Sequence, residues 1–180
     1  MLQKLEDFVK GRIPIPKCLD GDAYTVAGEA LAADEPKQTS VYGISFRRSP
    51  NEAPELKDFC YDDRIVLFGL TDYIRNNLTK KITREDIDKA EKFMSTAHAF
   101  GGALNFDRKV WDRVVNEFDG NLPIKIEALP EGSTFYPNEV PIQVTSLDEG
   151  FWEIAALIEA HLVGMVSIAS TRVTMERHLL

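Results

Sequence analysis

The stretch Asp119-Gly-Asn-Leu-Pro-Ile-Lys-Ile-Glu-Ala-Leu-Pro-Glu-Gly-Ser133 decides the fold of this 180-residue chain. Apolar and polar side chains alternate from Ile124 to Ala128, which predicts a strand with one mainly polar face. Pro130-Glu131-Gly132 is a turn signal, and the alternation resumes from Val140 to Val144. We therefore expect two short strands joined by a turn.

Helical periodicity dominates the chain before these strands. Apolar residues recur every three or four positions from Arg64 to Leu78, in the segment that Thr83 opens as an N-cap, and from Asp107 to Phe118. Asp119-Gly120 provides the stop of the last of these helices. A strand is expected earlier, from Thr39 to Arg48, where apolar and polar residues alternate.

One further helix follows the strands. It begins at about Phe151 and places Ile158 and Leu162 on its buried stripe. Gly164 is expected to interrupt it, and the small residues between Val166 and Met175 suit close packing. The order of three helices, two strands and one helix predicts an α+β fold with a small, mainly antiparallel sheet. Such a sheet leaves edges and an apolar helix face uncovered, which predicts a missing partner surface.

The composition is that of an ordinary globular protein. Hydrophobic residues make up 44% of the chain and charged residues 28%, so a packed core is expected. The formal net charge of -8 disfavours nucleic acid and anionic membranes as partners, because both bind clustered Lys and Arg. The sequence shows no N-terminal signal pattern and no window close to the ~20 apolar residues of a spanning helix. These features predict a cytoplasmic protein.

Cysteine and histidine form no metal-binding pattern. Cys18 and Cys60 lie far apart, and His98, His161 and His178 show no HxxH or HExxH spacing. A metal bound by histidine is therefore not expected, and His161 is interpreted as a residue at the edge of the core. The sequence also contains no Gly-rich phosphate loop, GxSxG or Walker pattern.

Three places carry side chains that could contact a ligand. Arg47-Arg48 end the first expected strand, and guanidinium groups suit phosphate oxygens because they offer paired donors in one plane. The alternative is that both arginines are simply solvated. Tyr24 could stack on a planar aromatic ligand or anchor a loop on the core. For Arg172 a packing or salt-bridge role is the favoured interpretation.

The order of strand, Pro-Glu-Gly turn, strand and helix resembles the type II nicotinamide and nicotinate phosphoribosyltransferases. Leu67-Phe-Gly-Leu-Thr-Asp-Tyr-Ile-Arg-Asn-Asn-Leu78 and Trp111-Asp-Arg-Val-Val-Asn-Glu-Phe-Asp119 resemble the nicotinamide enzymes in particular, whereas Tyr136-Pro-Asn-Glu139 is closer to the nicotinate enzymes. The resemblance extends from about Asp22 to Arg177. It is carried by the order and spacing of these short matches.

The resemblance implies a domain organisation and an activity. Residues 1–150 would form the N-terminal α+β domain, and residues 151–180 would begin an α/β barrel, most of which lies beyond this chain. The family transfers phosphoribose from 5-phosphoribosyl-1-pyrophosphate to the pyridine nitrogen of nicotinamide or nicotinate in NAD salvage. Mg²⁺ accompanies the pyrophosphate there, held mainly through substrate oxygens. The implied role is the N-terminal part of such an enzyme, inactive alone.

The same resemblance assigns candidate site residues. Asp22 and Tyr24 would lie in the base site, with the tyrosine ring stacked on the pyridine across a dimer interface. Arg48, with Arg47 as second choice, would reach phosphate or pyrophosphate. The chain departs from the family pattern just after Tyr24, where the usual Lys and His are missing. No catalytic residue is assigned, because the catalytic groups of the family lie beyond the end of this chain.

The implied partners are the C-terminal part of the enzyme or a full-length relative, in a homodimer or a hetero-assembly. The implied small-molecule substrates are nicotinamide and phosphoribosyl pyrophosphate. Three alternatives remain: a non-catalytic module that binds or regulates a full-length relative, a part of a nicotinate phosphoribosyltransferase, and a free-standing protein that binds a small aromatic ligand.

Overall fold

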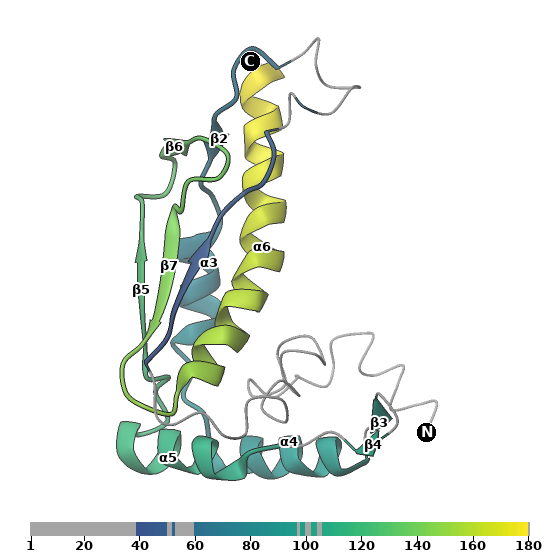
Figure 1. Cartoon of the computed structure of the whole chain (residues 1–180), viewed down its shortest axis with the longest axis vertical. Helices are drawn as coiled ribbons and strands as arrows, with labels where there is room; N and C mark the ends of the chain where they lie inside the picture. Colours follow the sequence, from purple (N-terminus) through teal and green to yellow (C-terminus); the bar gives the residue numbers. More distant parts are fainter. Residues whose placement is uncertain are drawn as a thin grey trace.

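The computed structural model describes residues 39–49, 52, 60–96, 98–99, 102–103 and 106–179 (Figure 1). Its elements are β1 (Val41–Ile44), β2 (Ile65–Val66), α3 (Leu70–Tyr73), the π-helical η4 (Ile74–Leu78), α4 (Arg84–Thr96), β3 (His98–Ala99), β4 (Gly102–Ala103), α5 (Arg108–Phe118), β5 (Ile124–Ala128), β6 (Thr134–Phe135), β7 (Ile142–Ser146) and α6 (Trp152–Leu179). Helices and short strands are mixed along the chain, so the predicted α+β class is confirmed.

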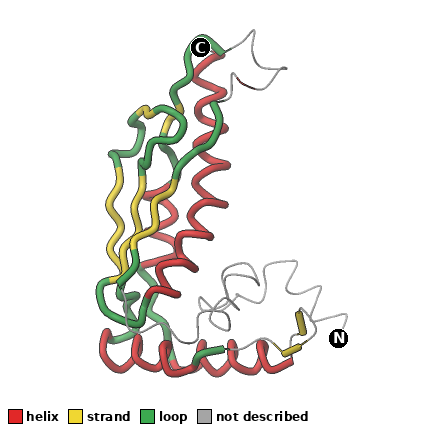
Figure 2. Tube along the Cα trace, in the orientation of Figure 1, coloured by secondary structure: helices red, strands yellow, loops and turns green. Residues whose placement is uncertain are grey.

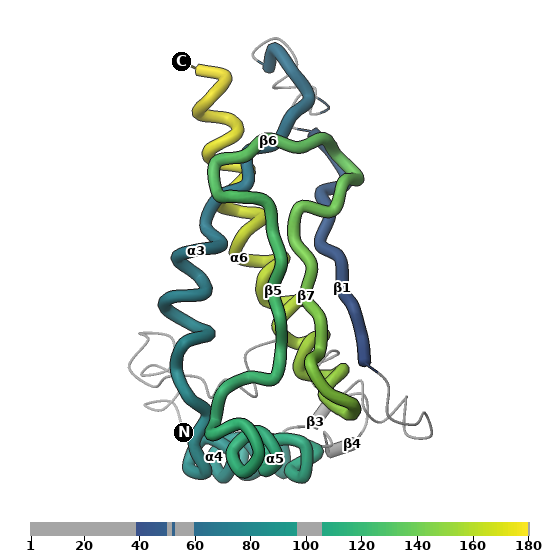
Figure 3. Tube along the Cα trace, turned by 90° about the vertical axis from the view of Figure 1, so that its left-hand side faces the viewer, coloured from purple at the N-terminus to yellow at the C-terminus, as the bar shows by residue number. Residues whose placement is uncertain are grey.

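The central sheet has three strands in the order β1-β7-β5, and both pairings are antiparallel. Ile142 at the start of β7 lies opposite Ile44 of β1 on one side and Ala128 of β5 on the other. Figure 3 shows the three strands side by side. β2 pairs with β6 and β3 with β4, again antiparallel. The predicted small antiparallel sheet is therefore confirmed.

The core lies between this sheet and α6. Ile142 and Val144 of β7 are fully buried, as are Phe151, Leu162 and Val166 at the start of α6 and along it. Each such side chain contributes about 1.5–3 kcal/mol by leaving water. α6 also contacts β1, β2 and α3, while α4 and α5 lie across the base of this layer (Figure 2). One long helix therefore packs against both strands of the β1-β7 pair and against β2.

The N-cap predicted at Thr83 is confirmed, and the structure adds an N-cap at Asp107 that was not predicted. The Thr83 hydroxyl accepts a hydrogen bond from the Asp86 backbone N–H at 3.2 Å, and the Asp86 carboxylate accepts one from the Thr83 N–H at 3.0 Å. At the start of α5, the Asp107 carboxylate accepts from the Lys109 N–H at 2.9 Å. These bonds satisfy donors that have no partner inside the helix.

The predicted Asp-Gly stop of α5 is also confirmed. Asp119 and Gly120 have φ angles of 52° and 75°, the left-handed region that glycine tolerates best. A Cβ added at Gly120 would approach the carbonyl oxygen of Ile82 to 2.4 Å. The Ile82 N–H donates to the Gly120 carbonyl oxygen at 2.8 Å. The stop therefore also fastens the loop before α4 to the end of α5.

The predicted helix from Arg64 to Leu78 is wrong in its first part. Ile65–Val66 form strand β2, and the helix begins only at Leu70. The extended residues bind partners far along the chain: the Leu67 N–H, for example, donates to the Ser133 carbonyl oxygen at 2.9 Å. Apolar spacing within the segment carries no information about such a partner.

Two strands have other bounds than predicted: β1 is shorter, and β7 is shifted by two residues to Ile142–Ser146. β1 ends at Ile44 rather than Arg48, and β7 begins at Ile142 rather than Val140. Both limits have one cause, because Pro141 precedes β7 and has no N–H to donate to a neighbouring strand. The pairing of β1 with β7 therefore stops where Ile44 lies opposite Ile142.

α6 continues without a break through Gly164, so the predicted interruption there is wrong. Glycine in a helix interior costs about 1 kcal/mol relative to alanine, and the burial of Leu162 and Val166 on either side outweighs that cost. α6 is also long and apolar enough to cross a membrane by length and composition, which corrects the expectation that no window approaches this length. A core helix meets the same criteria, and α6 packs along the sheet.

Candidate functional site

The arginines predicted to bind phosphate directly follow the central sheet. Arg47 and Arg48 come three and four residues after Ile44, the last residue of β1, and both are exposed. Ile44 is buried in the core and lies opposite Ile142 of β7. The sheet therefore fixes the point from which the two arginines leave the body of the protein.

The backbone is anchored on both sides of the arginine pair. Before it, the Phe46 carbonyl oxygen accepts from the Asn138 N–H at 2.8 Å, and the Phe46 ring meets the Phe135 ring edge-on with centroids 5.2 Å apart. After it, Ser49 is buried and its N–H donates to the Glu52 carboxylate at 3.1 Å. The pair thus lies on a short segment that is held at both ends.

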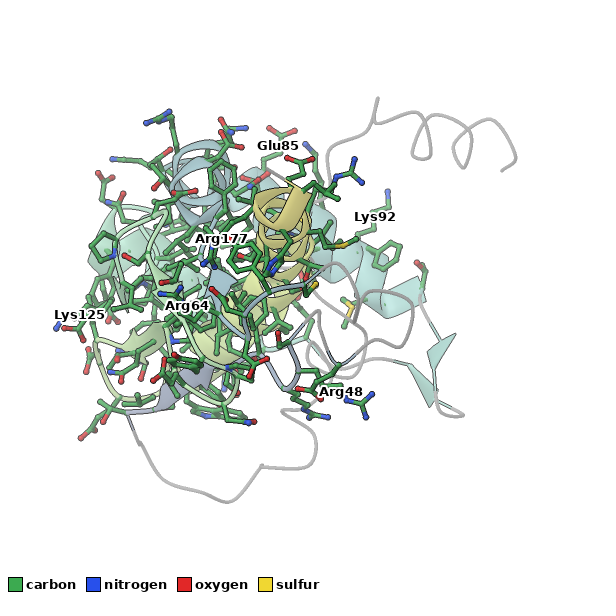
Figure 4. The ribbon with its side chains drawn as sticks, turned by 90° about the horizontal axis from the view of Figure 1, so that it is seen from above. Arg48, Arg64, Glu85, Lys92, Lys125 and Arg177 are labelled. Carbon is green, nitrogen blue, oxygen red and sulfur yellow. The ribbon has the colours of Figure 1, made fainter. Side chains whose placement is uncertain are left out.

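Arg47 and Arg48 form no ion pair within the part of the chain that the structure describes. Figure 4 shows Arg48 at the periphery, away from Arg64 and Arg177. Described carboxylates pair with five other arginines: Arg64, Arg108, Arg113, Arg172 and Arg177. No described carboxylate therefore occupies the donors of the two guanidinium groups after β1, and such groups can bind an anion through two parallel hydrogen bonds.

The other predicted positions have separate outcomes. Asp22 and Tyr24 lie outside the described residues. Arg172 pairs with Glu176 at 3.0 Å, in agreement with the salt-bridge role favoured for it. His161 is half-buried with its ring centroid 5.1 Å from that of Tyr73, which confirms its interpretation as a residue at the edge of the core.

Sequence reasoning missed a second group of charged side chains at the C-terminal end of α6. The Asp62 carboxylate accepts from Arg64 Nη2 at 2.7 Å and from Arg177 Nη2 at 2.6 Å. Burial acts to raise the pKa of Asp62, but hydrogen bonds from Arg64 and Arg177 and the charge of Arg177 outweigh it and lower the pKa to about 2. Asp62 and Arg177 are 115 residues apart in the chain, so no local pattern announces their contact.

Neighbouring contacts complete this second group. The Tyr61 N–H donates to His178 Nδ1 at 3.2 Å, and the two rings meet edge-on with centroids 4.5 Å apart. The guanidinium of Arg177 lies 5.3 Å from the centre of the Tyr61 ring. These groups fasten the end of α6 to the segment before β2. Because their charges are already paired, the arrangement holds the fold rather than a ligand.

In the described ranges, no three or more His, Cys, Asp or Glu side chains lie close enough together to hold a metal ion. The described side chains at the arginine pair therefore offer no such group of metal ligands. The chemistry that the described residues offer at this place is anion binding.

Residues 31–126 match the family model of the nicotinamide phosphoribosyltransferase N-terminal domain. The chain belongs to this family. The matched range covers more than half of the chain and contains β1, Arg47, Arg48 and the helices α3 to α5. It begins after Asp22 and Tyr24, and it ends within β5, before β6 and β7.

A curated relative and a solved structure agree with this family membership. The nicotinamide phosphoribosyltransferase of Xanthomonas campestris pv. campestris (strain 8004) is 31% identical over 91 residues, which are 50% of this chain and 18% of the relative. The crystal structure of human nicotinic acid phosphoribosyltransferase matches with a TM-score of 0.56 and 20% identity over 85% of this chain and 26% of that chain. The chain thus spans about a fifth to a quarter of these two proteins.

The structural match extends the likeness in fold beyond the range of the family model. It covers 85% of the chain, whereas the family model stops at residue 126. The resemblance inferred from strand, turn, strand and helix is therefore confirmed at the level of family and fold. The division at residue 150 and the roles of individual side chains stay predictions.

Proposed function

We propose that this chain is the N-terminal part of a phosphoribosyltransferase that forms nicotinamide mononucleotide in NAD salvage, and that it is inactive alone. One observation carries the proposal: Arg47 and Arg48 are exposed, unpaired with any described carboxylate and held on a segment anchored at both ends. Family membership supports it. The share of each relative that the chain covers supports the need for a further polypeptide.

The reaction makes clear what the arginines would do. The bond between C1 of the ribose and the pyrophosphate oxygen breaks, the pyridine nitrogen bonds to C1, and pyrophosphate leaves with the bonding electrons. Negative charge therefore grows on the leaving group. Guanidinium groups that are already oriented stabilise such charge without reorganising. Arg48, and secondarily Arg47, would bind phosphate oxygens of the substrate or leaving group.

Magnesium and the pyridine base complete the proposed site. When Mg²⁺ is bound, it supplies charge neutralisation at the pyrophosphate. Asp22 and Tyr24 would contribute to the base site, with the tyrosine ring stacked on the planar pyridine. We infer a homodimer or hetero-assembly in the cytoplasm, in which the catalytic groups come from the C-terminal polypeptide.

The identity of the base stays open within this proposal. The family model and the curated relative carry the name of the nicotinamide enzyme, and the solved structure carries that of the nicotinic acid enzyme. Nicotinate is therefore the alternative substrate. A non-catalytic module that binds a full-length relative is the second candidate function, which the limited share of the relatives that the chain covers also supports.

The test is mononucleotide formation measured by mass spectrometry with phosphoribosyl pyrophosphate, Mg²⁺ and either nicotinamide or nicotinate. We expect no product from the purified chain and product after co-expression with the C-terminal polypeptide of a relative. Product from the chain alone would show that 180 residues hold a whole active site. A folded two-chain complex without turnover would favour the non-catalytic module.

A further inference from the structure

The outward side of α6 carries an apolar stripe. Met165 and Ile168 are 52% and 71% exposed, Leu179 is 74% exposed, and Met175 is half-buried. With Arg172, these residues follow one another at intervals of three, four, three and four positions. We call these five residues the outer stripe. Because residues at this spacing lie on one face of a helix, the outer stripe is a continuous seam.

The opposite side of α6 is fully engaged with the protein. Val166, Ser170 and Thr174 are buried there. The Thr174 hydroxyl accepts from the Val66 N–H at 2.9 Å, and the Ser170 hydroxyl accepts from the Phe68 N–H at 3.0 Å. α6 is therefore fixed in rotation about its own axis. The outer stripe cannot turn inward to bury itself.

A lipid bilayer is a poor match for this face, although α6 has the length and composition of a spanning helix. The centre of the outer stripe is Arg172, which pairs with Glu176 at 3.0 Å on the exposed surface. A membrane that covered the whole outer stripe would have to take both charges into hydrocarbon at considerable cost. The net charge of -8 also gives no general attraction to anionic lipid.

Alternating intervals of three and four favour another helix as the occupant. Side chains at this spacing insert between the side chains of a facing helix. Gly164, next to the start of the outer stripe, has nothing within 4 Å of the position that a Cβ would take, so a partner backbone can approach closely there. The charges of Arg172 and Glu176 balance each other and offer polar contacts at the middle of the seam.

We infer that the outer stripe docks a helix of the polypeptide that corresponds to the part of the family chain outside this one. This inference rests on the proposed function. About three quarters of the solved relative's chain lies outside the match, because the match covers 26% of it. A standard interface uses about 20–30 residues on each side, so the outer stripe would be one part of a larger contact surface. A body of that size can cover the outer stripe together with adjoining surface.

The test is co-purification from a two-gene expression system. The second gene encodes a tagged Xanthomonas campestris relative from which the region aligned with this chain has been removed. Ile168→Glu and Met175→Glu place a carboxylate in the outer stripe. Leu147→Glu is the matched control, because Leu147 is 57% exposed and lies outside α6. Circular dichroism of each purified chain verifies the fold.

We expect wild type and Leu147→Glu to co-purify with the tagged polypeptide, and the two outer-stripe variants to bind about tenfold more weakly or worse, as central interface residues do. If wild type and both variants bind equally, the inference is overturned and the proposed function survives. If wild type does not bind at all, both are overturned.

Analytical ultracentrifugation of the chain alone tests whether a second copy of the chain covers the outer stripe instead. Monomeric wild type supports the inferred partner, whereas a dimer that Ile168→Glu dissociates would make a second copy the occupant and overturn the inference. Binding of wild type, but not of Ile168→Glu, to vesicles of phosphatidylcholine and phosphatidylglycerol would assign the outer stripe to a membrane surface and overturn it likewise.

Discussion

The carboxylate of Glu131 accepts a hydrogen bond from the backbone N–H of Thr71 at 2.9 Å, and it accepts another from the N–H of Gly69. These donors lie at the start of α3, where a helix leaves its N–H groups without internal partners. Glu131 belongs to the Pro130-Glu131-Gly132 turn, which is 60 residues away from Thr71. A turn between two strands therefore caps a helix elsewhere in the chain, and its negative charge suits the helix N-terminus.

Replacing this cap is expected to destabilise the fold. Glu131→Ala leaves the Gly69 and Thr71 donors without their partner, and should lower the free energy of unfolding by about 1–2 kcal/mol. Urea denaturation measures the change. The control is Glu127→Ala, because Glu127 forms a surface ion pair with Lys125 and its loss should change stability by less than about 1 kcal/mol. Equal effects of the two variants would contradict the capping role.

Stability should fall in acid because two carboxyl groups have a lowered pKa in the folded chain. For Asp62 the pKa falls from 3.8 to about 2, because the hydrogen bonds and charges of Arg64 and Arg177 outweigh the effect of burial. Burial alone would raise the pKa of Glu131, but hydrogen bonds from Thr71 and Gly69 outweigh this effect, so the pKa is lowered. The unfolded chain then binds more protons than the folded chain in this range.

The sign of the pH dependence follows from that difference. Both groups contribute their full stability above their unfolded pKa, and the contribution of Asp62 is lost as the pH falls from about 4 to about 2. We expect the urea midpoint of the wild type to decrease steadily over this interval. Asp62→Asn, which cannot titrate, should reduce the slope. An unchanged slope would remove Asp62 as its cause.

Arg48 is expected to govern phosphate binding in the reconstituted enzyme. Arg48→Ala should raise the KM for phosphoribosyl pyrophosphate by about tenfold to a hundredfold, since a charged hydrogen bond is worth about 1.5–3 kcal/mol. Its thermal stability should stay that of the wild type, because Arg48 forms no ion pair with described residues. The matched control is Arg75→Ala, at an exposed arginine of η4. If both variants raise the KM alike, the loss of any positive charge causes the effect, and a specific role of Arg48 is contradicted.

Tyr24 is expected to act on the base rather than on the phosphate. Loss of a stacked ring in Tyr24→Ala should raise the KM for nicotinamide about twofold to tenfold, which matches about 0.5–1.5 kcal/mol. The KM for phosphoribosyl pyrophosphate should change little. Steady-state kinetics with each substrate varied in turn makes the comparison. An unchanged KM for the pyridine substrate would exclude Tyr24 from the base site.

What the sequence predicted correctly is mostly local. Thr83 caps α4 through a bond to a residue three positions away, and Asp119-Gly120 ends α5 through its own φ angles. The alternation from Ile124 to Ala128 likewise reports a strand whose two faces differ. Each of these features is set by neighbours in the chain, so the residue types alone were enough to predict them.

What the sequence did not predict depends on distant partners. β2 replaced a predicted helix because Val66 and Leu67 bond to Thr174 and Ser133. α6 continued through Gly164 because tertiary burial outweighs a weak intrinsic preference. At the candidate site, the position of Arg48 after a strand was predictable. The absence of an ion pair between Arg48 and any described carboxylate, and the pairing of Arg177 with Asp62, could be seen only in the folded chain.

The middle strand of the sheet, β7, is the last of the three to be synthesised. Ser40, just before β1, bonds to Ser146 at the end of β7, 106 residues later. On the ribosome, β1 therefore has no strand of this sheet to pair with until β7 has emerged. The arginines that follow β1 can be fixed in place only after that long loop has closed, a step that slows folding and leaves an unpaired strand open to aggregation.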